Sequence, residues 1–323
     1  MAQGDLPAVH PQVRALLTAM GDIADPGPVQ PTPAELVAER AAYLEATLRL
    51  GGAAEPVASA VDLVVPSGDV RLPARLYAPL HAAETTELVV WMHGGGWYVG
   101  DVATFDRVGR SLANASGAKV LIVEYRLAPE HRWPVQIADA EAVVRWARST
   151  AGATQLATDP ARVALGGDSA GGHLAVVAAR RARADRLPPL RALLLAYPAL
   201  DPTLSSDSYS VFEQGPMLTK LDMARCWGFY LDGARLDDPD VAPLTATDWD
   251  GLPPAWIAVA GQDVLRDDGL ALVARLRAAG AAVEQRTFED MVHGFLRWGG
   301  VVDAARELVA WLGDGVRAGA SRA

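Results

Sequence analysis

The chain has a single cysteine, Cys226, among its 323 residues. One cysteine excludes an intrachain disulfide and any metal site built on several thiolates. The apolar runs are all shorter than the about 20 residues that a membrane-spanning helix needs, and the N-terminus lacks the pattern of a secretory signal peptide. The net charge is −10 and there is no basic run, which argues against nucleic acid or an anionic membrane as the main partner. These absences predict a soluble, cytoplasmic protein.

The order of the predicted elements indicates the fold class. Half of the residues are hydrophobic, and strand-like apolar runs begin at residue 57. The first two runs predict an antiparallel hairpin around the turn 66–69, and the later ones alternate with helical stretches. This alternation predicts an α/β fold with a mostly parallel, eight-stranded sheet and helices on both faces. The predicted strands cover 57–65, 70–78, 87–92, 119–125, 162–167, 191–197, 254–261 and 282–288, and the predicted helices about 104–116, 135–150, 170–184, 268–279 and 301–313.

Two segments stand outside this alternation. Residues 1–56 are predicted to be helical over 9–20 and from a capping box at Thr32–Glu35 to about Leu50. They are either a packing arm or part of a lid. The segment between Tyr197 and Pro254 is much longer than a single crossover needs, is rich in aromatic residues, and has a helical stretch at about 219–231. Because it follows a strand's carboxyl end, we expect it to cover the active-site edge of the sheet.

A short glycine-flanked motif predicts the nucleophile. Gly167-Asp168-Ser169-Ala170-Gly171 follows an apolar strand and precedes a helix, which fits the G-x-S-x-G turn of α/β-hydrolases. Such a turn is sharp and strained, and only glycine avoids a steric clash two residues either side of the serine. The sequence therefore predicts Ser169 as an exposed nucleophile.

A serine hydroxyl needs a base, and the base needs an orienting acid. Of the six histidines, His293 follows the last predicted strand and alone leaves room for an acid after Ser169, in the order Ser, acid, His. Asp263 directly follows a predicted strand and is the expected acid. Asp267 and Asp268 are rivals, but they lie one turn later, at a helix N-terminus that favours carboxylates without any catalytic role.

A glycine triplet predicts the oxyanion hole. His93-Gly94-Gly95-Gly96 comes directly after a buried strand, as in the HGGG type of oxyanion loop. Glycines let the backbone approach a ligand and direct N–H groups toward it. The expected donors are the N–H groups of Gly95, Gly96 and Ala170.

Together these motifs resemble the hormone-sensitive-lipase family of α/β-hydrolase esterases. The matching blocks occur in order over about residues 90 to 295: HGGGWYVGDVATFD (93–106), VEYRLAPEHRWP (123–134), GGDSAGGHLA (166–175), GQDVLRDDG (261–269) and MVHGF (291–295). Many relatives carry a glycine where this chain has Asp290, a departure that bears on the mobility of the histidine loop. We expect Glu130 and Asp139 to be scaffold carboxylates.

The resemblance implies hydrolysis of short- to medium-chain acyl esters through an acyl-enzyme, with no cofactor and no metal. It also implies a single domain over 1–323 with a helical cap formed by about 1–55 and about 200–240. Relatives often pair through an edge strand, so a homodimer is expected by analogy. The residues expected to line the substrate pocket are Trp97, Tyr98, Phe212, Leu218 and Trp227.

Two alternatives to an esterase remain. The same triad serves amide, lactone and carbamate hydrolysis. Some proteins of this fold are instead small-molecule receptors without catalysis, but these would be expected to lack the base, and His293 is present.

Overall fold

Eight strands form one sheet at the centre of the molecule. In the computed structural model, the described residues are 9–20, 31–82, 84–184, 189–231, 233 and 236–321. The strand order is β1-β2-β4-β3-β5-β6-β7-β8. The first hairpin and the β2–β4 pair are antiparallel, and all other pairs are parallel. The strands are β1 (Ser59–Ser67), β2 (Val70–Ala78), β3 (Leu88–Met92), β4 (Lys119–Val123), β5 (Val163–Asp168), β6 (Leu193–Ala196), β7 (Ala255–Gln262) and β8 (Val283–Val292).

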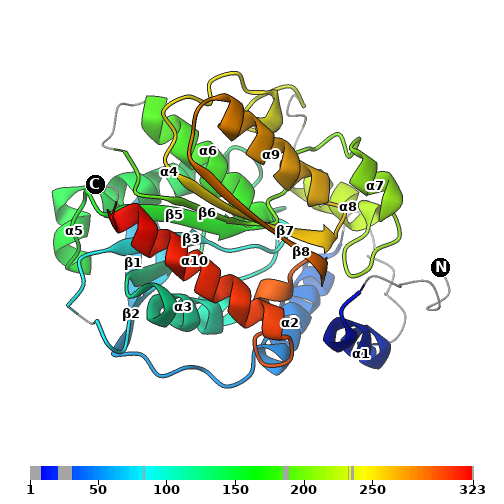
Figure 1. The fold of residues 1–323 in the computed structure, drawn as a ribbon, viewed down its shortest axis with the longest axis horizontal. Coiled ribbons are helices and arrows are strands. Elements are labelled where there is room, and N and C mark those ends of the chain that lie inside the picture. The colour runs from blue at the N-terminus through cyan, green and yellow to red at the C-terminus, as the bar shows by residue number, and fades with distance from the viewer. Residues whose placement is uncertain are drawn as a thin grey trace.

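Helices cover both faces of this sheet, so the predicted fold class is confirmed (Figure 1). On one face lie α3 (Val102–Ser116) and α10 (Asp303–Ser321), and on the other α4 (Val135–Ala147), α6 (Ala170–Ala184) and α9 (Arg266–Ala278). Most of the buried hydrophobic residues fall into two clusters, one for each face. Parallel strands covered on both faces are apolar along their whole length, and every residue of β3, β4, β5 and β6 is buried.

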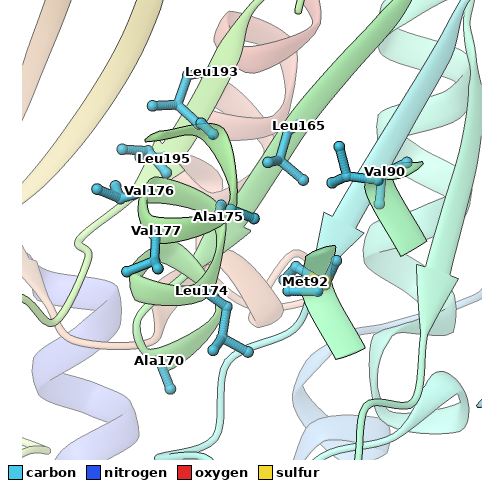
Figure 2. Close-up of a cluster of buried hydrophobic side chains, with 14 of the residues drawn as sticks. Val90, Met92, Leu165, Ala170, Leu174, Ala175, Val176, Val177, Leu193 and Leu195 are labelled. Atoms are coloured by element: carbon cyan, nitrogen blue, oxygen red, sulfur yellow. The ribbon is translucent and has the colours of Figure 1, made fainter. Parts of the chain in front are cut away.

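The helix that follows the serine packs directly on the middle of the sheet. Figure 2 shows Leu174 and Ala175 of α6 beside Met92 of β3 and Leu165 of β5. All four residues are fully buried. Burying one leucine side chain contributes roughly 2 kcal/mol to stability, so this contact fixes α6, and with it the turn that carries Ser169, on the sheet.

Further helices lie beyond the carboxyl ends of the parallel strands (Figure 1). They are α1 (Pro11–Met20), α2 (Pro33–Leu50), α7 (Asp207–Val211) and α8 (Lys220–Tyr230). The capping box predicted at the start of α2 is present, with Thr32 and Glu35 each bonded to the other's backbone N–H. Other parts of the two predicted cap segments, among them residues 1–8 and 21–30, lie outside the described residues.

The helix predicted over 135–150 is wrong at its end. It stops at Ala147, and a separate helix α5 (Thr150–Leu156) begins after Ser149, whose hydroxyl accepts the N–H of Gly152. A Cβ at Gly152 would lie 2.0 Å from the carbonyl oxygen of Trp146, so the glycine allows α5 to fold back against α4. The short helices α7, η1 (Pro243–Thr245) and η2 (Phe295–Arg297) were also not predicted. None of the described helices is both long and apolar enough to cross a membrane.

Candidate active site

Ser169 lies at the turn between β5 and α6, in a left-handed conformation with φ of 54°. The two flanking glycines are required there. A Cβ at Gly167 would lie 2.4 Å from the carbonyl oxygen of Gly171, and one at Gly171 would lie 2.0 Å from that of Met92. Real Cβ atoms do not approach backbone oxygens so closely, so glycine at both positions is what allows the serine to sit on this turn.

The structure brings Ser169, His293 and Asp263 together from three loops that follow strands β5, β8 and β7. Nε2 of His293 lies 3.0 Å from Oγ of Ser169, and Nδ1 lies 2.7 Å from Oδ2 of Asp263. The other carboxylate oxygen of Asp263 accepts the N–H of Leu265 over 3.0 Å. Because Asp263 is buried and oriented in this way, its second oxygen is directed at Nδ1, which places the proton of a neutral imidazole on Nδ1 and leaves Nε2 free to accept the serine proton.

A tyrosine that the sequence did not single out supports His293. The ring of Tyr197 packs edge-on against the imidazole with centroids 4.8 Å apart, and its hydroxyl accepts the N–H of Leu296 over 3.2 Å. Tyr197 is fully buried and directly follows β6. Its place at the same sheet edge as the serine was the available signal, but nothing in the sequence showed that its ring reaches the histidine loop.

The glycine triplet forms a tight loop after β3, which we name the oxyanion loop (residues 93–99). Gly95 and Gly96 have φ of 121° and 56°, and the N–H groups of Tyr98 and Val99 both donate to the Gly95 carbonyl. Within the described part of the chain, no acceptor takes the N–H of Gly95 or Gly96. Ala170 is the first residue of α6, and N–H groups in a first helical turn have no partner in the helix. The three expected donors are thus all available to a ligand.

Asp168, the residue before the serine, anchors the start of the oxyanion loop. Its Oδ1 accepts the N–H of Gly94 over 2.9 Å and the indole N–H of Trp91 over 3.2 Å. Burial raises the pKa of this carboxyl to about 6, although Arg297 and these two donors act in the opposite direction. No role was predicted for Asp168 from the sequence. A carboxylate at the end of an otherwise apolar strand was the available signal, because a buried carboxylate needs polar partners.

The two rival carboxylates lie at the start of α9, as expected, and neither contacts His293. Asp267 accepts the backbone N–H of Ser208 over 2.8 Å, and Asp268 accepts the N–H groups of Leu200 and Asp201 over 2.7 and 3.0 Å. Both therefore fix the chain that follows β6.

The two expected scaffold carboxylates also have structural partners. Asp139 is buried, accepts the hydroxyl of Ser67 over 2.7 Å and pairs with Arg126 over 2.6 Å. Glu130 pairs with Arg40 of α2 over 2.7 Å.

The five residues expected to line the pocket fall into two groups. Trp97 and Trp227 belong to the buried core, where their ring centroids are 4.2 Å apart. Tyr98, Phe212 and Leu218 are partly exposed and pack against the edge of that core. Only the second group presents appreciable surface to a ligand in this structure.

Buried histidines predict how stability depends on pH. Burial lowers the pKa of His173 on α6 from 6.5 to about 4. Between these two values the unfolded chain binds a proton at this position that the folded chain does not, so His173 lowers the stability as the pH falls from 6.5 toward 4. His93, whose pKa is also lowered by burial, likewise lowers the stability as the pH falls. The buried acids Asp168 and Asp268 have raised pKa values, so they increase the stability as the pH falls.

We expect His173→Phe to remove the histidine's share of this slope. Urea unfolding at several pH values between 6.5 and 4.5 should show that the free energy of unfolding falls less steeply in the variant, by about 1.4 kcal/mol per pH unit. The variant also loses the bond from Nε2 to the Val241 carbonyl, which lowers stability equally at every pH. Parallel curves for the two proteins would contradict a neutral, buried His173.

Residues 89–297 match the family model for the alpha/beta hydrolase fold. This chain belongs to that family, in its hormone-sensitive-lipase group. All five motif blocks, from 93–106 to 291–295, lie inside the matched region.

This α/β-hydrolase is similar to several curated esterases. It is 40% identical over 242 residues to carboxylesterase NlhH of Mycobacterium tuberculosis, covering 73% of this chain and 75% of that one. It is 31% identical over 309 residues to an ethyl acetate hydrolase of Pseudomonas putida, covering 93% and 96% of the two chains.

Solved structures agree with the fold of this α/β-hydrolase over nearly its whole length. Ester hydrolase EH1AB1 from the metagenome of Lake Arreo, solved with a bipyridine phosphonate derivative, superposes with a TM-score of 0.89 at 31% identity, covering 97% of this chain and 99% of that one. A thermostable esterase of Pseudomonas putida gives a TM-score of 0.88 at 28% identity, covering 97% and 98%.

Proposed function

We propose that this carboxylesterase cleaves short- to medium-chain carboxylic esters through an acyl-enzyme on Ser169, with His293 as base and Asp263 as its orienting acid. The observation that carries the proposal is the continuous hydrogen-bond chain from Ser169 Oγ to His293 Nε2 over 3.0 Å and from His293 Nδ1 to Asp263 over 2.7 Å. A nucleophile, a base and an acid in this arrangement are the parts that acyl transfer needs.

In the proposed first half-reaction, Oγ of Ser169 attacks the ester carbonyl while its proton moves to Nε2 of His293. The imidazolium that forms is stabilised by the buried carboxylate of Asp263. The carbonyl oxygen becomes an oxyanion and accepts the N–H groups of Gly95, Gly96 and Ala170. When the tetrahedral intermediate collapses, the C–O bond to the alcohol breaks and the leaving oxygen takes the proton from Nε2.

The second half-reaction reverses these roles for water. Nε2 of His293 takes a proton from a water molecule, the hydroxide attacks the acyl carbonyl, and the same N–H groups hold the second oxyanion. Collapse releases the carboxylic acid and returns the proton to Oγ of Ser169. Each oxyanion donor in such a site contributes on the order of 10²–10³ in rate.

A series of p-nitrophenyl esters tests the substrate class. We expect kcat/KM to be highest for the acetate, butyrate or octanoate and to fall sharply at the palmitate. The relative from Pseudomonas putida that matches almost end to end is named for a two-carbon acyl ester, and the partly exposed Tyr98, Phe212 and Leu218 are offered as the pocket that limits chain length. A maximum at the palmitate, or no turnover of any ester by the folded protein, would contradict the proposal.

Amide hydrolysis is the second candidate. A rabbit relative, 30% identical and covering 76% of this chain and 78% of that one, is named arylacetamide deacetylase. The same triad serves both bonds. Comparing p-nitrophenyl acetate with p-nitroacetanilide separates the two: faster cleavage of the anilide would make the amide the preferred substrate class.

The cap belongs to the same proposal. Within a single domain, about 1–55 and about 200–240 would together cover the site, and support comes from the ion pair of 2.6 Å between Glu39 on α2 and Arg225 on α8. A homodimer and a cytoplasmic location remain predictions from the sequence. Sizing by light scattering tests the dimer.

A further inference from the structure

The oxyanion loop is held in a conformation that its own sequence does not favour. Gly95, Gly96 and Trp97 all have positive φ, of 121°, 56° and 64°. Glycine adopts such angles freely, but for a residue as bulky as tryptophan they are strained. Strained backbone persists only where surrounding contacts hold it, so the contacts outside the loop matter for where its N–H groups lie.

One of these contacts comes from α2, which is separated from the loop in the chain by the strands β1, β2 and β3. Nε of Arg40 donates to the backbone carbonyl of Tyr98 over 2.8 Å, and Nη2 donates to the carbonyl of Ala128 over 3.1 Å. Both terminal nitrogens also donate to Glu130, over 2.7 and 2.8 Å. The N–H of Ala128 in turn donates to the carbonyl of Trp97 over 2.9 Å. One guanidinium therefore links α2, the oxyanion loop and the segment 125–134.

Glu39, the residue before Arg40, is linked to Tyr98 through Arg225 of α8. Glu39 accepts Nη2 of Arg225 over 2.6 Å, and Nη1 of Arg225 donates to the hydroxyl of Tyr98 over 3.3 Å. The Arg225 guanidinium also lies 5.4 Å from the centroid of the Tyr98 ring. Glu39 and Arg40 thus hold the side chain and the backbone of Tyr98 respectively.

The oxyanion loop is also closely packed against α8. A Cβ at Gly96 would lie 2.5 Å from Sγ of Cys226, the residue after Arg225. The Cα of Gly96 is therefore in contact with α8, so a shift of the loop toward α8 is blocked. The contact from Arg40 holds the loop from the α2 side.

We propose that Arg40 is a positioning residue for ester hydrolysis, which acts through the Tyr98 carbonyl to fix the N–H groups of Gly95 and Gly96 toward the oxyanion. The inference rests on the proposed function, because it assigns the oxyanion loop its role in that reaction. Arginine suits this position because its planar fork of five donors serves two carbonyls and a carboxylate at once. Donors that are aligned before the reaction stabilise the transition state without reorganisation, so loosening them lowers kcat more than it raises KM.

The test compares Arg40→Ala and Arg40→Lys with a matched control, Glu130→Gln, in the full chain. Arg40→Ala is expected to lower kcat about tenfold while KM stays within about twofold. Arg40→Lys is expected to lose less, because an ammonium can still reach one of the acceptors. Glu130→Gln keeps the bond from Nε to Tyr98 and is expected to act like the wild type. An equal loss of kcat in Glu130→Gln and Arg40→Ala would overturn the inference, because the link to segment 125–134 alone would then explain it.

Two further measurements separate positioning from a general loss of structure. Amide hydrogen exchange of peptides covering 93–99 is expected to be faster in Arg40→Ala and unchanged in Glu130→Gln. A trifluoromethyl ketone, whose adduct with a serine carries an oxyanion, is expected to bind more weakly to Arg40→Ala by the same factor as kcat/KM falls. If Arg40→Ala shows the same exchange rates in this loop and the same inhibitor affinity as the wild type, the inference is overturned. If Arg40→Ala does not fold, Arg40→Lys carries the same measurements, with smaller effects in the same direction.

The activities of the wild type and of Arg40→Ala distinguish a failure of this inference from a failure of the proposed function. A folded wild-type protein that cleaves no ester would overturn the proposed function, and the exchange rates would still decide whether Arg40 holds the loop. An active wild type with an equally active Arg40→Ala would overturn the inference alone.

Discussion

Replacing Ser169 with alanine is expected to lower kcat for p-nitrophenyl butyrate by at least about 10⁴-fold, because loss of the nucleophile removes the covalent route altogether. The residual rate is what the oxyanion hole and substrate binding give without a nucleophile. The fold should persist. The side chain is small, and alanine and serine meet the same backbone strain at φ of 54°.

The control for this variant is Ser111→Ala on α3, where the hydroxyl donates to Glu55 over 2.6 Å. It removes a serine hydroxyl from the other face of the sheet and should leave kcat and KM unchanged. Thermal unfolding of both variants establishes that they are folded. A Ser169→Ala protein that is folded and retains more than about one hundredth of the wild-type kcat would mean that another group attacks the ester.

Asp263→Asn is expected to lower kcat by about 10⁴-fold while KM changes little. The substitution keeps the shape of the side chain, but an amide in this place can direct its NH₂ group at Nδ1 of His293. The imidazole must then carry its proton on Nε2, where it cannot accept the serine proton. The buried negative charge that stabilises the imidazolium is lost as well.

Asp267→Asn is the matched control, because it makes the same chemical change four residues later. Asp267 accepts the N–H of Ser208 and pairs with Arg266, and it has no bond to His293. We expect this variant to keep its kcat and to lose some stability. Equal losses of kcat in the two variants would show that Asp263 has no special relation to the base.

The glycine-flanked turn that carries Ser169 could be predicted from the sequence for a physical reason. Gly167 and Gly171 occur where any Cβ would meet a backbone oxygen at 2.4 Å or less, so the geometry allows only one residue type, and the pattern is visible in the sequence. The alternation of strands and helices can also be recognised in the sequence, because strands covered on both faces must be continuously apolar. That is why the six strands β3 to β8 were predicted close to their observed places in the chain; their order within the sheet was not predicted from the sequence.

The contacts that support the site could not be predicted in this way. Tyr197 reaches His293, and Arg40 reaches Tyr98, through contacts between residues distant in the sequence, and no local pattern shows which distant surface a side chain will meet. The helix α7 has five residues, too few for a periodic pattern to show. Asp168 directly follows the predicted strand 162–167, but its partners at Gly94 and Trp91 follow only from the pairing of β3 with β5.

The most direct test of the account is to trap the acyl-enzyme. The wild-type protein is mixed with p-nitrophenyl acetate, quenched with acid within the first turnover, digested and analysed by mass spectrometry, with Ser169→Ala treated in parallel. The account predicts a burst of p-nitrophenol and one acetyl group on the peptide that carries Ser169, and neither of these in the variant. An acetyl group on a different residue, or steady turnover without any covalent adduct at Ser169, would contradict it.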